Sequence, residues 1–172
     1  MSVRLSLSVQ YADQTKDWAS ILPRPLLRQW VKAALQLDAR LTLRFVDAIE
    51  GQKLNQEFRG KDYATNVLTF AYNDSEEFDE FPEEIRAQLT QEMQESGIEA
   101  DIILCGAVLE REAQEQNKSI VAHAAHLVVH GVLHAQGFDH LDDEEAELME
   151  ELERQILARL GFDNQRSILP FS

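Results

Sequence analysis

The spacing of apolar residues changes partway along the 172-residue chain, and this change constrains the fold more than any other feature. In the first half, apolar and polar residues alternate, which is typical of half-buried β-strands. This pattern predicts strands near residues 3–9, 41–45 and 66–72, and a short buried strand follows at residues 102–104. From residue 107 onward the apolar spacing becomes helical. We therefore expect a small sheet combined with a helical C-terminal half.

Helical spacing also occurs between the expected strands. It predicts helices near residues 26–35, 52–58, 83–94, 107–117, 120–136 and 143–160. In the last of these, an apolar residue recurs every four positions, at Leu148, Leu152, Ile156 and Leu160. We predict one α+β domain over residues 1–172, in which a small four-stranded mixed sheet packs with about five or six helices. The acidic stretch near residues 73–99 is interpreted as an insert in this domain.

Charge is distributed unevenly along the chain. The whole chain carries a net charge of −15, but residues 1–73 contain 10 Lys and Arg against 7 Asp and Glu. Residues 74–101 contain 11 acidic side chains against Arg86 alone, and residues 139–153 contain 9 acidic side chains and no basic one. We interpret both acidic runs as solvated faces of helices. A polyanionic partner must therefore approach the surface built by the first half.

The sequence also bears on location and redox chemistry. No apolar run reaches the length of a signal peptide core or a membrane span, so we expect a cytoplasmic protein without a membrane partner. The single cysteine, Cys105, rules out an internal disulfide and stands in an apolar run. We interpret it as a buried thiol without a function.

Three histidines near the end of one C-terminal helix are spaced for metal binding. His130 and His134 are four residues apart, so both imidazoles project from one helix face and can reach one ion. Gly137 can end the helix in a left-handed conformation, so that the returning chain presents His140 to the same ion. We predict that these three histidines bind one divalent metal ion. Asp139 is a candidate for orienting a ligand or acting as a base.

The number of ligands indicates a catalytic metal. Catalytic zinc has three protein ligands and an open fourth position, whereas structural zinc sites are closed by four. Three imidazoles suit zinc and also accept nickel, copper or iron. We expect one zinc ion in a hydrolase active site, with other divalent transition metals as alternatives.

The histidine spacing matches that of the metzincin proteases, so a protease-like zinc hydrolase is the first alternative. Those enzymes carry a glutamate general base directly after the first histidine, and this chain has Gly131 there. A protease is therefore disfavoured. His123 and His126 continue the histidine series but lie two turns and one turn from His130. They could support a metal ligand or contact RNA, but we expect them to pack or to face a groove rather than bind the ion.

Several separate motifs point to one known family. They are Phe58-Arg-Gly-Lys-Asp62, Thr65-Asn-Val-Leu-Thr-Phe70, Asp101-Ile-Ile-Leu-Cys105 and the three-histidine segment. In these motifs and over nearly its full length, the chain resembles the YbeY endoribonuclease family of rRNA maturation factors. The resemblance implies a single-strand-specific, metal-dependent endoribonuclease that acts at the 3′ end of small-subunit ribosomal RNA and in ribosome quality control. It implies single-stranded RNA, ribosomal RNA, the small subunit with its proteins and the Era GTPase as partners.

The resemblance also assigns the metal to the three histidines, and RNA cleavage to Arg59. From the residues alone, a surface ion pair of Arg59 with Asp62 or Glu57 is the simpler interpretation. A guanidinium can, however, hold a phosphate at two points, and the resemblance favours this role. Arg44 and Lys61 are further candidates for contacts with RNA.

The expected mechanism is metal-assisted cleavage of a phosphodiester. The ion would act as a Lewis acid, and Arg59 would stabilise the charge that develops on the phosphoryl oxygens. The nucleophile stays open between a water activated by the ion and the ribose 2′-OH. A non-catalytic ribosome assembly factor with a structural metal is the other alternative.

Overall fold

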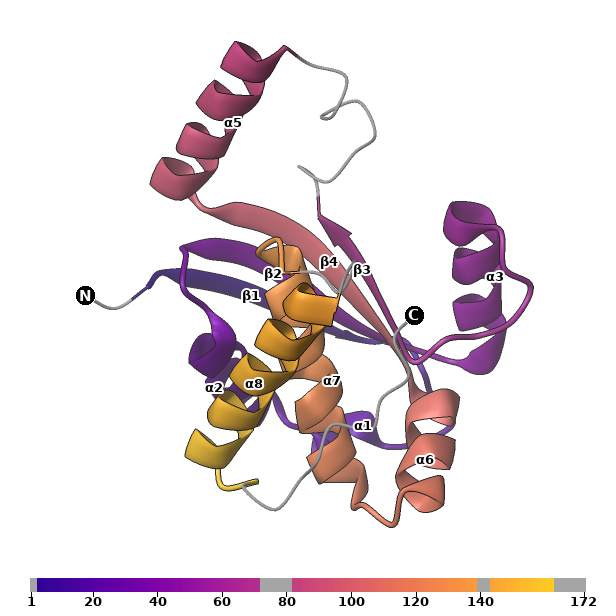
Figure 1. Ribbon diagram of the computed structural model, residues 1–172. Coiled ribbons are helices and arrows are strands. Elements are labelled where there is room, and N and C mark those ends of the chain that lie inside the picture. The colour runs from indigo at the N-terminus through magenta and orange to yellow at the C-terminus, as the bar shows by residue number, and fades with distance from the viewer. Residues whose placement is uncertain (1–2, 72–81, 139–142, 163–172) are drawn as a thin grey trace.

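The sheet of this protein is mixed and has an antiparallel strand at one edge (Figure 1). The computed structural model describes residues 3–71, 82–138 and 143–162. Its four strands are β1 (Leu5–Tyr11), β2 (Ala39–Val46), β3 (Val67–Ala71) and β4 (Ile98–Cys105), arranged in the order β1-β2-β4-β3. β1 and β4 both run parallel to β2, whereas β3 runs antiparallel to β4. The predicted four-stranded mixed sheet is therefore confirmed.

Seven helices occur within the described residues. They are α1 (Trp18–Ile21), α2 (Arg24–Ala34), α3 (Ala48–Arg59), α5 (Glu83–Ser96), α6 (Gly106–Glu115), α7 (Ile120–Ala135) and α8 (Asp143–Arg159). The α+β class is confirmed, and each predicted helix has a counterpart. The additional helix, α1, has four residues, which is too short to show a helical period in the sequence. Residues 73–81 of the expected acidic insert lie outside the described residues.

The helices cover the two faces of the sheet unequally (Figure 1). The larger hydrophobic core lies between the sheet and helices α2, α7 and α8, and its sheet side is formed by Leu41, Leu43, Phe45, Ile102 and Leu104. A smaller cluster on the other face is formed by Val46, Leu68, Ile103, Cys105 and Val108, with Leu54 of α3 packed against it. Helices α3 and α7 therefore lie on opposite faces of the sheet.

Helix α7 is the central helix of the larger core. It packs against α2, α6, α8 and strands β3 and β4, and 13 of its 16 residues are buried. A helix that is apolar all round is stable only when other elements surround it. Its first turn is capped by Ser119, whose side chain accepts a hydrogen bond from the backbone N–H of Ala122 at 3.0 Å. The histidines of α7 are thus held on a rigid, enclosed element.

The buried side of α8 differs from the predicted stripe. Leu148 is 55% exposed, whereas its neighbour Met149 is fully buried. A residue every four positions drifts about 40° around a helix per step, because the helical period is 3.6 residues. The side of α8 that enters the core is formed by Met149, Glu153, Ile156 and Leu157.

No helix among the described residues is long and apolar enough to cross a membrane.

Candidate functional site

The structure brings two of the three predicted metal ligands together. The Nε2 atoms of His130 and His134 lie 3.0 Å apart on successive turns of α7, with their rings inclined at 75°. This spacing lets both nitrogens address one point in space. The third predicted ligand, His140, and Asp139 lie outside the described residues. Over residues 3–71, 82–138 and 143–162, no group of three or more His, Cys, Asp or Glu side chains is arranged as a metal site.

The end of α7 has the expected glycine turn. Gly137 has a φ of 100°, a backbone conformation that residues with a Cβ atom rarely adopt. Its N–H donates to the carbonyl of His134 at 3.0 Å, and the N–H of Phe138 donates to the carbonyl of Leu133 at 3.1 Å. These two bonds form the Schellman arrangement that closes a helix. The chain therefore turns back immediately after the second histidine.

A buried carboxylate on α8 joins two histidines of α7. Glu153 is 1% exposed; its Oε1 lies 2.5 Å from Nδ1 of His130, and its Oε2 lies 3.0 Å from Nε2 of His126. The interpretation of residues 139–153 as a purely solvated face is therefore wrong at Glu153. The available signal was its position in the sequence, since Glu153 is four residues from Met149 and three from Ile156, both in the core.

The two histidine contacts keep Glu153 ionised. Burial raises the pKa of a carboxyl group, but hydrogen bonds and charge interactions with His126 and His130 lower the pKa of Glu153 to about 2. Burial also lowers the pKa of His126, which favours its neutral form. A carboxylate only accepts hydrogen bonds, so both histidine rings donate to Glu153.

This donation decides which nitrogen of His130 is available to a metal. When Nδ1 donates its proton to Glu153, Nε2 of the neutral ring keeps a lone pair, directed toward His134. Metal-binding histidines in proteins are oriented in this way by a carboxylate at the other ring nitrogen. The described part of the site therefore fits a divalent metal of the zinc type, which accepts imidazole nitrogen.

A second carboxylate holds the first histidine of α7. Oε1 of Glu112, on α6, lies 2.9 Å from Nε2 of His123 and accepts from Nδ2 of Asn66 at 3.1 Å. Burial alone would raise the pKa of Glu112, but the bonds from His123 and Asn66 lower it. Oδ1 of Asn66 in turn accepts from the N–H of Val67 at 2.7 Å. This network ties the start of β3 to α6 and α7, and as expected His123 and His126 pack inside the protein.

Gly131 faces the sheet at close range. A Cβ atom at this position would lie 2.9 Å from Cγ2 of Ile102 on β4 and 3.5 Å from Oγ1 of Thr69 on β3. The helix can approach the strands this closely because position 131 has no side chain. A glutamate here would have to enter the packed sheet and could not serve as the general base of a metzincin. Close packing against the sheet thus explains why glycine stands at position 131, where a metzincin protease has glutamate.

The expected basic residue, Arg59, is the last residue of α3 and is exposed. Within the described residues neither Arg59 nor Lys61 forms an ion pair. Asp62, which was the simpler partner expected for Arg59, instead accepts a hydrogen bond from Nε2 of Gln52 at 2.8 Å. Gly60 follows with a φ of 69° and turns the chain away from the helix. Both cations are therefore available to an external anion.

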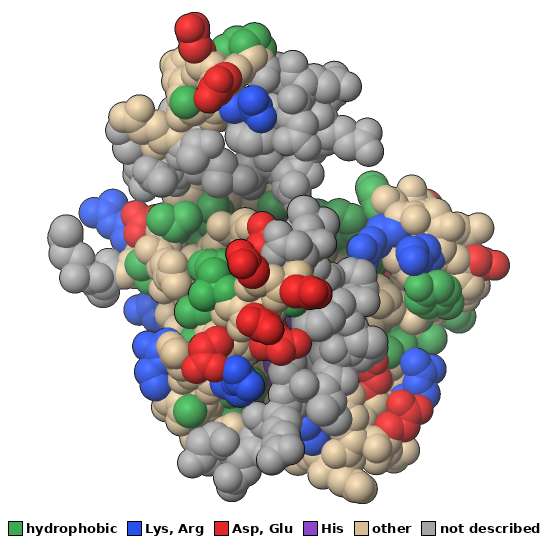
Figure 2. Space-filling model, viewed as in Figure 1, with side chains coloured by type: hydrophobic (Ala, Val, Ile, Leu, Met, Phe, Trp, Pro, Cys, Tyr) green, Lys and Arg blue, Asp and Glu red, His purple; other side chains and the backbone are tan. Residues whose placement is uncertain are grey.

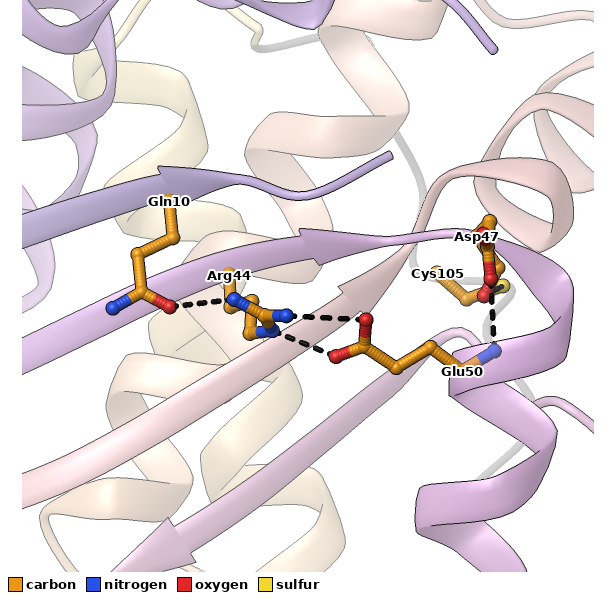
Figure 3. Close-up of polar contacts among 5 residues, drawn as sticks. All are labelled: Gln10, Arg44, Asp47, Glu50 and Cys105. Carbon is orange, nitrogen blue, oxygen red and sulfur yellow. Dashed lines mark hydrogen bonds and ion pairs between the residues drawn. The ribbon is translucent and has the colours of Figure 1, made fainter. Parts of the chain in front are cut away.

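Arg44 differs from Arg59 in having partners. Figure 3 shows its guanidinium between Gln10 and Glu50, with Nε 2.7 Å and Nη2 3.1 Å from the two Glu50 oxygens, and Nη1 2.8 Å from Oε1 of Gln10. The pKa of Arg44 is raised by these bonds to Glu50. Arg44 is thus occupied in holding β1, β2 and α3 together, which does not favour its predicted contact with RNA.

Figure 3 also shows Cys105, the last residue of β4. It is 2% exposed, its Sγ lies 3.8 Å from the carbonyl oxygen of Asp47, and burial raises the pKa of its thiol. A buried thiol with a raised pKa is a poor nucleophile. The structure agrees with the expected buried thiol.

Comparisons with known proteins agree with this architecture. A family model described as Endoribonuclease YbeY matches residues 9–161. A protein of that name from Herminiimonas arsenicoxydans is 60% identical over 161 residues, covering 94% of each chain. Another from Nitrosospira multiformis is 49% identical over 161 residues, covering 94% of this chain and 81% of the relative.

A solved structure supports the fold as well. The solution structure of a Thermotoga maritima protein matches 95% of this chain and 99% of its own, with a TM-score of 0.50 and 22% sequence identity. At that identity the match concerns the fold alone. The family model and the relatives extend over nearly the whole chain, and on that basis this chain belongs to the YbeY endoribonuclease family.

Proposed function

We propose that this protein is a metal-dependent endoribonuclease that cleaves single-stranded RNA. Membership of the YbeY endoribonuclease family supports this proposal. The observation that carries the metal dependence is the approach of the His130 and His134 Nε2 atoms to 3.0 Å, with Glu153 behind His130.

The proposed metal ligands are His130, His134 and His140. The neutral ring of His130 would bind through Nε2 while its Nδ1 donates to Glu153, which fixes the ring orientation. A bound zinc ion, or another divalent transition metal, would supply Lewis acidity toward the scissile phosphate and lower the pKa of a bound water. The contribution of Glu153 is to keep the ring in place before RNA arrives.

Arg59 is proposed to hold the phosphate that is cleaved. Its planar guanidinium can donate two hydrogen bonds to phosphoryl oxygens and stabilise the charge that develops on them. It has no ion-pair partner within the described residues, so binding RNA would not require an internal pair to break.

The fold restricts the path of the RNA. Helices α3 and α7 lie on opposite faces of the sheet and flank its edge strand β3 (Figure 1). Figure 2 shows acidic side chains over α8 and basic side chains on the side of the molecule formed by α3. A polyanion is repelled by the first surface and attracted by the second. We therefore propose that RNA approaches from α3 and crosses the β3 edge to reach the histidines.

The proposed biological substrate is ribosomal RNA, at the 3′ end of the small-subunit RNA, and the proposed role includes ribosome quality control. The small ribosomal subunit with its proteins and the Era GTPase are the proposed partners, and the cytoplasm is the proposed location. The support for these assignments is the family to which the chain belongs.

The test is cleavage of one labelled RNA sequence in single-stranded and duplex form by purified protein without a histidine tag. We expect cleavage of the single strand, loss of cleavage with a chelator and recovery with zinc. Casein in the same buffers should stay intact. Cleavage that resists chelation after metal removal has been verified, or chelator-sensitive casein hydrolysis, would contradict the proposal. The product ends, cyclic phosphate against 5′-phosphate, distinguish the 2′-OH from water as nucleophile.

A further inference from the structure

One aromatic side chain at the end of α3 is exposed without an evident structural reason. Phe58 precedes Arg59 and is 61% exposed. Its ring meets that of Phe70 on β3 edge-to-face, with centroids 5.0 Å apart and planes at 62°. This contact is of the kind that fixes the orientation of an aromatic ring. Phe58 is therefore an anchored aromatic surface that faces water.

Single exposed apolar residues are common in proteins and usually need no explanation. Phe58 differs because of its neighbours: Tyr63, in the same turn region, is 55% exposed, and the cations Arg59 and Lys61 stand between the two rings in the sequence. Figure 2 shows hydrophobic and basic side chains next to each other on this side of the molecule. Neither cation forms an ion pair within the described part of the chain.

This combination has a specific chemical meaning. Proteins bind single-stranded RNA by stacking unpaired bases on aromatic rings while cations hold the backbone phosphates. An apolar protein surface would match the exposed rings but would leave Arg59 and Lys61 without anions. A duplex would satisfy the cations but could not place a base on the ring, because its bases are already stacked.

We propose that Phe58 is a base-stacking platform for single-stranded RNA, on which one base of the substrate rests while Arg59 and Lys61 hold adjacent phosphates. The platform rests on the proposed function and adds a physical source for the preference for single strands. Stacking tolerates any base, because every base has a π-face. The platform therefore selects unpaired nucleotides rather than a sequence.

The test uses two substitutions at Phe58 and one matched control in the full-length, metal-loaded protein. Phe58→Leu keeps an apolar side chain against Phe70 but removes the aromatic face. Phe58→Trp restores a face and adds a reporter, since the native Trp18 and Trp30 are each 1% exposed and shielded from RNA. The control is Ile49→Ala, which removes a 79% exposed apolar side chain from the other end of α3.

Steady-state cleavage of single-stranded RNA and stopped-flow fluorescence provide the readouts. We expect Phe58→Leu to raise KM about tenfold or more with a much smaller change in kcat, which is the effect of one lost stacking contact. We expect Phe58→Trp to have nearly the wild-type KM and its fluorescence to be quenched on mixing with RNA, before cleavage. Ile49→Ala should keep the wild-type KM.

An RNA with an abasic site in the bound segment separates stacking from general apolar contact. Scanning the abasic position should identify one nucleotide whose loss weakens wild type but not Phe58→Leu. An unchanged KM for Phe58→Leu, or an unquenched Phe58→Trp with normal cleavage, would overturn the platform while leaving the nuclease intact. Absence of RNA cleavage by the wild type would overturn the proposed function itself. If Phe58→Leu does not fold, the quenching of Phe58→Trp decides the question.

Discussion

The histidine cluster of α7 and the exposed end of α3 are built in opposite ways. Three of the four α7 histidines contact a carboxylate on a neighbouring helix, either Glu112 on α6 or Glu153 on α8. At the end of α3, Phe58, Arg59 and Lys61 are exposed, and neither cation has an ion-pair partner among the described residues. The first region is organised before any ligand arrives, whereas the second offers groups that a ligand must satisfy.

This contrast indicates which property a mutation in each region should change. Changes in the α7 cluster should alter stability, because buried polar groups are costly when left unpaired, and changes at His130, His134 or the Glu153 contact should also alter metal binding. Changes at the end of α3 should alter RNA binding and turnover but leave metal binding and stability unchanged, because these exposed side chains contribute little to the folded state.

The largest effect is expected from His134→Ala. Two remaining imidazoles hold a divalent ion far more weakly than three, so the purified variant should lack stoichiometric metal and should not cleave RNA. Elemental analysis and a cleavage assay measure both. The matched control is His123→Ala, which removes a buried histidine held by Glu112 and should keep its metal. One tightly bound ion per chain in His134→Ala would contradict the assignment of this ligand.

Arg59→Ala should reduce turnover about a hundredfold to a thousandfold, as expected when a donor to a developing negative charge is removed. Metal content and melting temperature should stay at the wild-type values. Arg59→Lys should rescue only in part, because an ammonium cannot reproduce a planar two-point contact. The control is Lys53→Ala, which removes another exposed cation from α3. Normal turnover by Arg59→Ala at saturating RNA would remove Arg59 from the chemistry.

Glu153→Gln should lower metal affinity about tenfold to a hundredfold, the usual effect of losing the partner of a metal-binding histidine. A glutamine can accept from one ring only, and its NH2 group would face the donor of the other. Competition with a chromophoric chelator measures the affinity. Glu151→Gln is the matched control, because Glu151 lies two residues away with its side chain 51% exposed. Equal affinities for the two variants would show that Glu153 does not orient the metal site.

The loss of protein stability at low pH should also depend on Glu153. The pKa of Glu153 is about 2 in the folded protein, below its ordinary value of 4.5. Because folding lowers this pKa, the ionised Glu153 stabilises the folded protein at pH values above its unfolded-state pKa of 4.5. This contribution to the free energy of unfolding is lost as the pH falls from 4.5 toward 2. Denaturant unfolding of the metal-free protein across this range should therefore show a steeper loss for wild type than for Glu153→Gln. Parallel curves would contradict the ionised state of Glu153.

The smallest effect is expected from Gly131→Ala. The new Cβ would approach Ile102 at 2.9 Å, and overpacking of this kind costs more than the gain from replacing a helical glycine. We expect a net loss of about 1 kcal/mol, which corresponds to a melting temperature about 2–4 °C lower. Thermal unfolding measures it, and an unchanged or higher melting temperature would show that the helix has room at this point.

Much of the fold could be predicted from the period of the apolar residues, but the start of one strand was predicted wrongly. Strand β4 begins at Ile98, four residues before the predicted start. Ile98 and Ala100 are buried while Glu99 between them is exposed, so this half of β4 has the ordinary alternation of a strand. This half of β4 was missed in the sequence because its acidic residues continue the acidic composition of the preceding helix. The continuous apolar run from Ile102 was visible because both faces of β4 are covered there.

The candidate site was predictable only where spacing along one element decides the geometry. His130 and His134 could be paired from their separation on a helix, and Gly137 from its place at the end. Glu153 could not, because its contact with α7 depends on how two helices pack. Likewise, no local pattern shows that Asp62 pairs with Gln52 and leaves Arg59 without an ion pair among the described residues.

The separate roles of the histidine cluster and the end of α3 are tested most directly by a zinc titration of metal-stripped protein, in which single-turnover cleavage of single-stranded RNA is measured at each occupancy. For the wild type, we predict a rate that rises with bound zinc and reaches a plateau at one ion per chain. For Arg59→Ala, we predict the same zinc binding with a rate that stays near zero. Full cleavage without zinc, or equal rates for the two proteins at full occupancy, would contradict the division of labour between the histidine cluster and the end of α3.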